Sequence, residues 1–546
     1  MAYYYSLLLP RKRRLSSNRF ALTWRTCAAR LAMTAALVCG GPAVAASGEL
    51  DNTFATICPL AVCSGGRLLS SVGSEGYASI SAMAVQPDGA IVVAGSCDHR
   101  ITGVLQDGLV HQRICVQRYR APLVATDSWI DPSFGAGGTK IIAPFRNNNV
   151  TVTSLALNGD GTVLIAGTCT RTSLPEVMCV VRLLANGQLD GSFGSANGAA
   201  YVEFPTAART TKMLLQTNGQ IVMIGQCGTA APYSLCATRL HVNGAMDTSY
   251  GSAGVAINTA FDFYPTGAML RSDGSVSVVG TSLTNAAARH TFFSSFLSNG
   301  ALGNSNSSPF PPGVTTLPDS ASGGVALTAA GNHIIAGTCR NNAVDATRDI
   351  FCLRRLNPFG YVDGTFGSNG NAYANFATGT GSGTATPHAI VLGPDGKILV
   401  VGTCKHAAYD YCVARFDNDG TLDAMFNSSG FRGDLTAQPT ANGYALALQG
   451  DGKILVGGGC TDAGTGKFCT VRLNGGPDNF QHCNLDIDDD GKVLGTTDAV
   501  IHARVAAGLS GAVALNSITF APNAKRTTWP AIRDFLGNHC AMRVQP

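Results

Sequence analysis

Cysteine is the residue whose spacing in this sequence most clearly implies chemistry. Two of the 18 cysteines lie in the first 46 residues, and the other 16 fall into neighbouring pairs. Six pairs bracket a segment of variable length between two apolar, strand-like runs, as cross-strand disulfides at the base of loops require. All eight pairs, the six loop-bracketing ones and the two outer ones, are Cys58/Cys63, Cys97/Cys115, Cys169/Cys179, Cys227/Cys236, Cys339/Cys352, Cys404/Cys412, Cys460/Cys469 and Cys483/Cys540.

Metal binding and free buried thiols are the alternatives to disulfide bonds. The sequence has no C-x-x-C pair and no regular Cys/His set, and its ten histidines are scattered, which disfavours a metal site. The unit around Gly274 lacks both cysteines together, with Ser282 and Phe293 at the two expected places. Pairwise loss favours a bond over two independent packing roles, and disulfides are typical of exported proteins.

A run of alternating carboxylates near the C-terminus could bind a cation. Asp486, Asp488 and Asp490 occupy loop positions 1, 3 and 5, and Gly491 at position 6 allows a sharp turn. The spacing resembles the calcium loop of dockerin type I modules, in which Asp486, Asp488 and Asp490, the Lys492 carbonyl and Asp498 would bind Ca²⁺. Asp498 comes one residue later than in that family and no second copy follows, so a solvated acidic turn stays the alternative.

The elements that carry the cysteines repeat seven times along the chain. Each unit has a tight turn between two apolar runs, which predicts a β-hairpin. The turns lie at 86–89, 158–161, 216–219, 271–274, 328–331, 393–396 and 449–452. A second landmark, L-D-x-S-F-G, ends most units, at 130–135, 189–194, 246–251, 362–367 and 422–427, and a partial copy begins at Leu50.

These two landmarks resemble the delta-60 repeat family, which is related in style to NHL-type propellers. The resemblance rests on Q-x-D-G-K-I-x-V-x-G at 449–458 and on L-D-x-S-F-G, covers 50–475, and implies a propeller-like fold without established catalytic residues. Repeats of four strands bury their faces by packing around an axis, and a closed ring protects sheet edges. We therefore predict an all-β seven-bladed β-propeller over 47–476, with a small helical module at 477–546. An open β-solenoid is the alternative.

The chain ends predict how the ring closes. The last unit, 444–475, has three strands and then ends, whereas 50–75 holds the Leu-Asp landmark and an outer-strand pattern without a hairpin before it. The two fragments together would complete one blade. The C-terminal helix-like run 500–507 and the region 516–536, with Trp529, would form the helical module.

The first 46 residues are expected to be a cleaved signal peptide. A basic leader precedes an apolar run at 31–38 and the small-residue sequence Ala43-Val44-Ala45-Ala46. The leader holds seven of the 38 basic residues and no acidic one, so the mature chain has 31 basic and 34 acidic residues and a formal net charge of −3. This balance argues against nucleic acid as a partner. We expect a secreted protein, or a periplasmic or cell-surface one if the source is bacterial, without a transmembrane segment after cleavage.

The motifs of common enzyme classes are missing from the sequence. It has no G-x-S-x-G elbow, no H-E-x-x-H and no P-loop, and its repeated aspartates and arginines suggest turn and anchor roles. The longest bracketed loop, 98–114, supplies candidate ligand contacts at His99, Arg100, His111 and Arg113. We expect a monomeric extracellular binding or scaffold propeller for a protein or glycan. A secreted lyase or hydrolase, or a carbohydrate-associated component docked through the C-terminal module, is the alternative.

Overall fold

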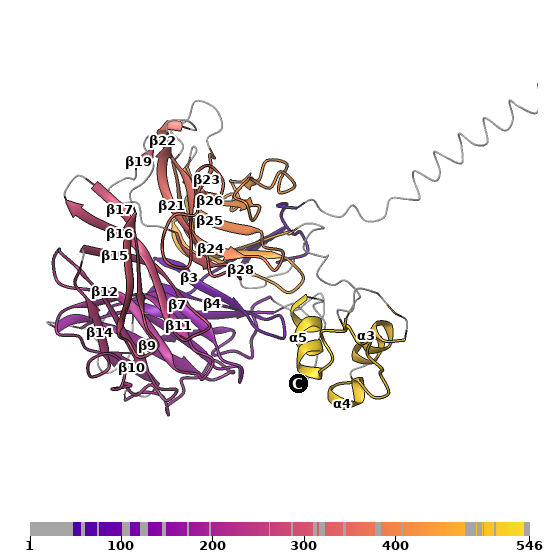
Figure 1. Cartoon of the computed structure of the whole chain (residues 1–546). Coiled ribbons are helices and arrows are strands. Elements are labelled where there is room, and N and C mark those ends of the chain that lie inside the picture. Colours follow the sequence, from indigo (N-terminus) through magenta and orange to yellow (C-terminus); the bar gives the residue numbers. More distant parts are fainter. Residues whose placement is uncertain are drawn as a thin grey trace, which may run out of the picture. The chain divides into compact units, whose positions relative to one another are not determined.

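The computed structural model describes most of the chain after the leader (Figure 1). The predicted signal segment 1–46 lies outside the described residues. The described residues are 47–55, 61–73, 76–100, 110–120, 129–144, 149–171, 174–195, 198–260, 262–285, 288–308, 314–315, 323–341, 345–376, 384–405, 408–475, 487–488, 494, 496–506 and 509–539.

Seven antiparallel sheets form the blades of a β-propeller, which confirms the predicted fold class. Blade 1 contains β3 (Ala78–Val85), β4 (Ile91–His99), β5 (His111–Tyr119) and β6 (Thr139–Ile142). Blade 2 contains β7 (Val150–Leu157), β8 (Val163–Arg171), β9 (Leu174–Leu183) and β10 (Ala199–Val202). Blade 3 contains β11 (Ala208–Leu215), β12 (Ile221–Cys227), β13 (Ser234–Leu240) and β14 (Val255–Asn258).

The remaining four blades follow the same order. Blade 4 contains β15 (Asp262–Leu270), β16 (Val276–Asn285), β17 (Ala288–Phe296) and β18 (Leu302–Ser308). Blade 5 contains β19 (Val314–Thr315), β20 (Gly324–Leu327), β21 (His333–Asn341), β22 (Asp345–Leu356) and β23 (Asn371–Ala374). Blade 6 contains β24 (Thr384–Leu392), β25 (Ile398–Lys405), β26 (Tyr409–Phe416) and β27 (Phe431–Arg432). Blade 7 contains β28 (Ala441–Leu448), β29 (Ile454–Asp462), β30 (Thr465–Leu473), β2 (Arg67–Ser70) and β1 (Ala61–Ser64).

The two ends of the repeat region close the ring, as the sequence predicts. In blade 7, β2 pairs antiparallel with β30 and places Arg67 opposite Val471 and Leu68 opposite Thr470. The first strands of successive blades contact one another around the ring, and β28 of blade 7 contacts β3 of blade 1. Because the closing sheet joins segments from both ends, the ring has its N- and C-terminal strands in one blade.

The repeated tight turn between the first two strands of a blade depends on glycine. In blade 1 the Gln86 N–H donates to the Ala90 carbonyl, and the Gly89 N–H donates to the Gln86 carbonyl. Gly89 has φ of 82°, and the corresponding Gly161 also has φ of 82°. Residues with a Cβ rarely adopt this left-handed conformation, which explains the glycine at the end of all seven repeated turns.

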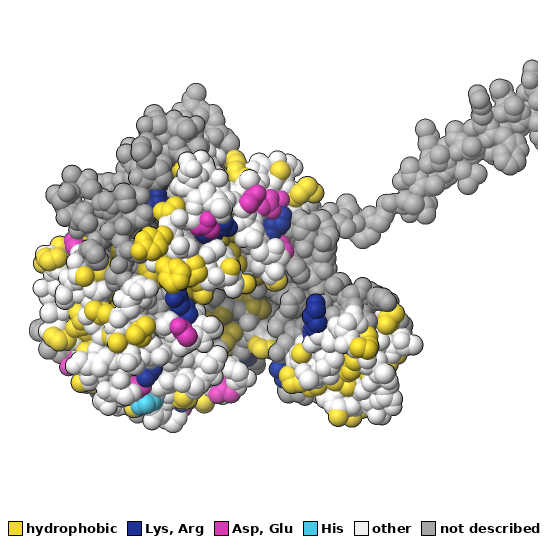
Figure 2. All heavy atoms as spheres, viewed as in Figure 1, with side chains coloured by type: hydrophobic (Ala, Val, Ile, Leu, Met, Phe, Trp, Pro, Cys, Tyr) yellow, Lys and Arg dark blue, Asp and Glu magenta, His cyan; other side chains and the backbone are white. Residues whose placement is uncertain are grey.

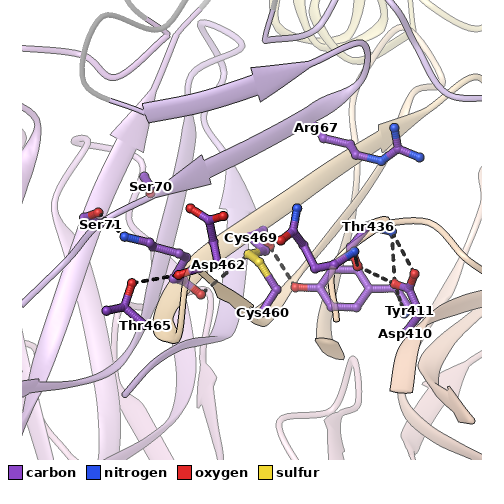
Figure 3. The surroundings of a disulfide bond; sticks show 12 residues. Arg67, Ser70, Ser71, Asp410, Tyr411, Thr436, Cys460, Asp462, Thr465 and Cys469 are labelled. Atoms are coloured by element: carbon purple, nitrogen blue, oxygen red, sulfur yellow. Dashed lines mark hydrogen bonds between the residues drawn. A yellow bond between two sulfur atoms is a disulfide. The ribbon is translucent and has the colours of Figure 1, made fainter. Parts of the chain in front are cut away.

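Six disulfides join the second and third strands of their blades, in agreement with the predicted pairs. They are Cys97–Cys115, Cys169–Cys179, Cys227–Cys236, Cys339–Cys352, Cys404–Cys412 and Cys460–Cys469, with Cα–Cα separations of 5.8–5.9 Å. Figure 3 shows Cys460–Cys469, where the Tyr411 hydroxyl donates to the Cys469 carbonyl.

The two outer cysteine pairs are not among these six disulfides. Cys63 lies on β1 opposite Leu68, but its predicted partner Cys58 lies outside the described residues. Cys483 and Cys540 both lie outside the described residues as well. The described part of the chain therefore accounts for six of the eight expected pairs, and Cys58–Cys63 and Cys483–Cys540 stay predictions.

Blade 4 replaces its disulfide with an aromatic contact, and its register corrects one position. Gly280 pairs with Phe292, just as Gly402 of blade 6 pairs with Cys412. Phe292, rather than Phe293, therefore stands in the place of the second cysteine, and its ring packs edge-on against Phe263 at 4.7 Å. The loop between the second and third strands varies in length from blade to blade. The sequence alone therefore placed the second cysteine position at Phe293, one residue too late.

Among the described residues after the propeller, three helices are present, namely α3 (Asp498–Ala506), α4 (Gly511–Ala514) and α5 (Trp529–His539), coloured yellow in Figure 1. Their buried core contains Ile487, Ile501, Val505, Ile532 and Leu536, and Trp529 packs against it. Helices thus occur near both positions that the sequence indicates, although 516–528 is not helical. None of the described helices is long and apolar enough to cross a bilayer.

Candidate functional site

The acidic loop provides two of its predicted calcium ligands within the described residues. Asp488 and Asp498 are both fully buried. The Asp498 carboxylate accepts backbone N–H groups from Ile487, Asp488 and Leu494 at 2.6–3.2 Å, so it fastens the loop to the start of α3. Asp486, Asp490 and Lys492 lie outside the described residues. Across the part of the chain that is described, no cluster of three or more His, Cys, Asp or Glu side chains could hold a metal ion.

The segment 98–114, which the sequence predicts to be a loop, is partly β-structure. Its candidate ligand contacts therefore lie at the ends of strands or within a strand. Strands β4 and β5 extend to His99 and His111, which lie opposite each other. His99, Arg100 and His111 are half-buried at this loop base. Arg113 is only 1% exposed and lies opposite Cys97 inside the blade, so the structure removes it from the surface contacts. Residues 101–109 lie outside the described part.

The repeated arginines and aspartates form a brace within and between blades. In six blades the arginine Nε donates to the aspartate of L-D-x-S-F-G at 2.7–2.9 Å, and the guanidinium lies 4.7–5.0 Å from the aromatic ring of the same motif. Five of these arginines also donate to a backbone carbonyl of the next blade. The pairs are Arg118–Asp131, Arg182–Asp190, Arg239–Asp247, Arg355–Asp363, Arg415–Asp423 and Arg472–Asp51.

Blade 4 lacks this brace but makes the same link from another position. Ser295 and Gly303 stand where other blades have the arginine and the aspartate. Arg271, from the turn after the first strand, donates instead to the Pro358 carbonyl of blade 5 and lies 5.9 Å from the Phe293 ring. Because the link is retained when its residue changes, the repeated arginines serve the fold, as the sequence suggests.

The inner strands, which are the first strands of the blades, place variable residues around the axis. Six of them contain a β-bulge at the same position, five residues before the tight turn. Opposite each bulge, the second strand has a glycine, such as Gly95 or Gly402, where a Cβ would overlap the inner-strand backbone. The bulged residues are Ser81, Thr153, Thr211, Thr266, His388 and Tyr444.

His388 and Tyr444 form an aromatic pair on the adjacent inner strands of blades 6 and 7. Their ring centroids are 4.8 Å apart, and both side chains are partly exposed. Burial lowers the pKa of His388 to about 4, so the imidazole is neutral at pH 7. Burial, together with the nearby Tyr77, raises the pKa of the Tyr444 phenol. The pair therefore offers a neutral base beside a protonated hydroxyl, at residues that the sequence analysis did not single out.

A second non-repeated group lies at the cysteine-loop end of the inner strands in blades 2 to 4. Arg209 is exposed near the start of β11, and its Nε lies 2.5 Å from the Glu176 carboxylate of β9. Tyr233 and Tyr264 pack edge-on at 5.5 Å, and the Asp262 carboxylate accepts the Tyr233 N–H. The bulged ring and this group together are named the channel-mouth site. Aligning the seven repeats on their tight turns would have revealed its variable polar column.

The opposite face of the ring, formed by the tight turns and the L-D-x-S-F-G turns, exposes apolar side chains. Figure 2 shows apolar side chains interspersed with charged ones on the side of the molecule in view. The exposed apolar residues in the L-D-x-S-F-G turns and in the short turns just before them include Val242, Leu297, Leu302, Phe359, Tyr361 and Met425. The nearby Arg182 and Arg239 are engaged in the braces, where they donate to the Val242 and Ser298 carbonyls, so we assign no site there.

Comparison with known proteins supports the fold. Residues 159–193, 393–426 and 449–475 match a family described as a domain of unknown function (DUF5122) beta-propeller. This match and the seven-bladed ring fit a propeller repeat family. The matched segments lie within the propeller, and nothing in the comparisons supports a dockerin module. No curated protein matches the chain.

Several solved structures have a similar arrangement of strands at low sequence identity. The polysaccharide lyase Uly1 has a TM-score of 0.42 and 10% identity, over 79% of this chain and 98% of that one. A protein of unknown function from Dyadobacter fermentans has a TM-score of 0.37 and 12% identity, over 60% and 96%. An endo-arabinase from Bacteroides thetaiotaomicron has a TM-score of 0.27 and 8% identity, over 57% and 100%. At these TM-scores the similarity carries no argument about activity.

Proposed function

We propose that the protein is an exported binding propeller whose ligand enters the central channel from the cysteine-loop face. The bulged position of the inner strands carries the proposal. Its backbone geometry repeats from blade to blade, whereas its side chains change from Ser81 to Thr211, His388 and Tyr444. A position that the fold fixes but does not use for packing is free to carry recognition.

The rest of the molecule supports this role by its rigidity. Six disulfides and six arginine–aspartate braces hold the blades, so the channel residues are positioned before any ligand arrives. The disulfides also fit an oxidising compartment outside the cytoplasm.

Calcium bound by Asp486, Asp488, Asp490, Lys492 and Asp498 would order the start of the C-terminal module. We propose it as a structural ion.

Catalysis at the same position is the second candidate, and His388 is the observation that favours it. A neutral imidazole 4.8 Å from a protonated phenol could accept and donate protons during cleavage of a bound chain. Lyase or hydrolase activity would then share the binding site. Cleavage products from an incubated ligand would distinguish an enzyme from a binding protein.

The test uses the mature chain, expressed with its disulfides, on arrays of oligosaccharides and of peptides. We expect saturable binding that His388→Ala and Tyr444→Ala weaken by about tenfold or more, because each truncation removes a stacking or hydrogen-bonding group. Tyr361→Ala is the matched control, since Tyr361 is 60% exposed on the opposite face. Binding that Tyr361→Ala weakens while both channel variants retain it would overturn the proposal.

A further inference from the structure

Lys212 is a long, charged residue at a position that is small in the other six inner strands. It follows the bulged residue of β11, and the equivalent residues of the other blades are all small: Ala82, Ser154, Gly267, Gly324, Ala389 and Ala445. Nothing in the packing of the ring requires a long cationic side chain here, because six blades are built without one. The lysine therefore has a role that the fold does not explain.

The position of β11 directs this side chain toward the axis. Inner-strand residues pack against neighbouring blades on both sides, so solvent reaches the middle of such a strand through the central channel. Lys212 is the fifth of the eight residues of β11, and its side chain is exposed. Surrounding protein nevertheless desolvates the ammonium and lowers its pKa. Exposure together with desolvation is the environment of a narrow, water-filled channel.

Lys212 has no charged partner within the described part of the chain. Three residues on the described inner strands have fully charged side chains at neutral pH, and two of them are occupied. Arg209 pairs with Glu176, and Asp262 accepts the Tyr233 N–H. Lys212 makes no ion pair, and desolvation alone shifts its pKa. A desolvated cation without a counter-ion is stabilised when an anion binds beside it.

The neighbours of Lys212 indicate what kind of molecule would carry the anion. Thr211 and Thr266, on adjacent inner strands, place hydroxyl groups at this level and donate long hydrogen bonds of 3.3–3.4 Å to backbone carbonyls. His388 and Tyr444 provide flat rings at the same level of the channel. Hydroxyl-rich walls and aromatic faces with one cation fit a saccharide that bears a carboxylate or a sulfate.

We propose that the ligand of the channel-mouth site is an acidic saccharide whose oxyanion binds the Lys212 ammonium. This inference rests on the proposed binding function and names its ligand class. The recognised group is the same for a uronate carboxylate and a sulfate ester, and the two sources are separated by the experiment. An acidic peptide would meet the cation equally well but would make less use of the stacking rings.

The test is isothermal titration of the mature, disulfide-bonded protein with four probes: trigalacturonate, its methyl ester, a sulfated trisaccharide and hexa-aspartate. We expect one of the acidic saccharides to bind and the methyl ester to bind at least tenfold more weakly than its free acid. Lys212→Ala should weaken acidic-saccharide binding about 10- to 100-fold, the range of one charge-assisted hydrogen bond. This variant places in β11 the residue that three other blades already use, so folding is preserved. Lys212→Arg should keep binding within a few fold.

Lys405 provides the matched control, because its ammonium lies 5.0 Å from the Tyr409 ring at a cysteine loop rather than on an inner strand. Lys405→Ala should bind like the parent protein. Equal binding of acid and ester, unchanged binding by Lys212→Ala, preference for hexa-aspartate, or no binding of either acidic saccharide would overturn the inference. If His388→Ala and Tyr444→Ala abolish binding of a neutral ligand, the proposed function stands while the acidic ligand class fails.

Discussion

Replacing Arg415 with methionine should destabilise the whole ring. The Arg415 side chain is fully buried, its Nε lies 2.7 Å from Asp423, and its Nη1 donates to the Gly475 carbonyl of blade 7. Removing one partner of a buried ion pair costs about 3–5 kcal/mol, because the other charge stays buried. Lys397 lies 3.0 Å from Asp423 and offsets part of this loss. We therefore expect the low end of the range, about 3 kcal/mol.

Thermal and urea unfolding of the disulfide-bonded protein provide the assay. Unfolding entropy scales with chain length, so for a ring of roughly 430 residues a loss of about 3 kcal/mol lowers the Tm by about 3 °C. Arg182→Met should lower it by less, since Arg182 and Asp190 are each 13% exposed and better screened. Lys140→Met is the control, because the Lys140 ammonium makes a long hydrogen bond of 3.4 Å to the exposed Gln188 side chain rather than a buried ion pair. If Arg415→Met melts like Lys140→Met, the brace does not stabilise the ring.

Three further predictions concern disulfides, pH and calcium. Cys404→Ser/Cys412→Ser should lower the free energy of unfolding by about 2–3 kcal/mol, measured by urea denaturation, and a loss near zero would contradict a structural bond. Burial would raise the pKa of Asp247, but hydrogen bonds from Ser249 and Arg239 lower it to about 2, so its contribution is complete above pH 4 and is lost as the pH falls toward 2. Burial lowers the pKa of His333 to about 4, so the folded state should also lose stability as the pH falls from about 6.5 to 4. In Tm measurements across this range, His333→Ile, which uses the residue of Ile91 and Ile221, should remove part of the upper loss, and an unchanged profile would contradict it. Isothermal titration of the mature chain with Ca²⁺ should show binding that Asp488→Ala abolishes, and no heat at millimolar Ca²⁺ would reject the site.

The fold could be predicted from the sequence because its signals are local and repeated. Each tight turn with glycine specifies a hairpin, and seven copies specify the number of blades. The fragment around Leu68 and the fragment around Val471 are each an incomplete blade, and each has the strands that the other lacks. Closure of the ring through one shared blade could therefore be predicted from the same pattern. The six blade disulfides could be predicted as well, because the two cysteines of each pair have fixed positions in the second and third strands of the blade.

Other features depend on contacts that the sequence does not display. The second cysteine position of blade 4 was assigned to Phe293 instead of Phe292, because the loop before this strand varies in length. Only the pairing of Phe292 with Gly280 fixes the position. Arg113 looked like a loop residue, whereas extension of β5 makes it part of the blade interior. His388 and Tyr444 meet because two blades are adjacent in the ring, and neither residue belongs to a recognisable motif.

A structure of the mature protein with an acidic oligosaccharide bound would test most directly whether the channel is the binding site. We expect the sugar ring to lie against His388 and Tyr444, with its carboxylate or sulfate within hydrogen-bond distance of the Lys212 Nζ. A ligand held at His99 and Arg100, or on the turn face around Tyr361, with the central channel free of ligand, would contradict it.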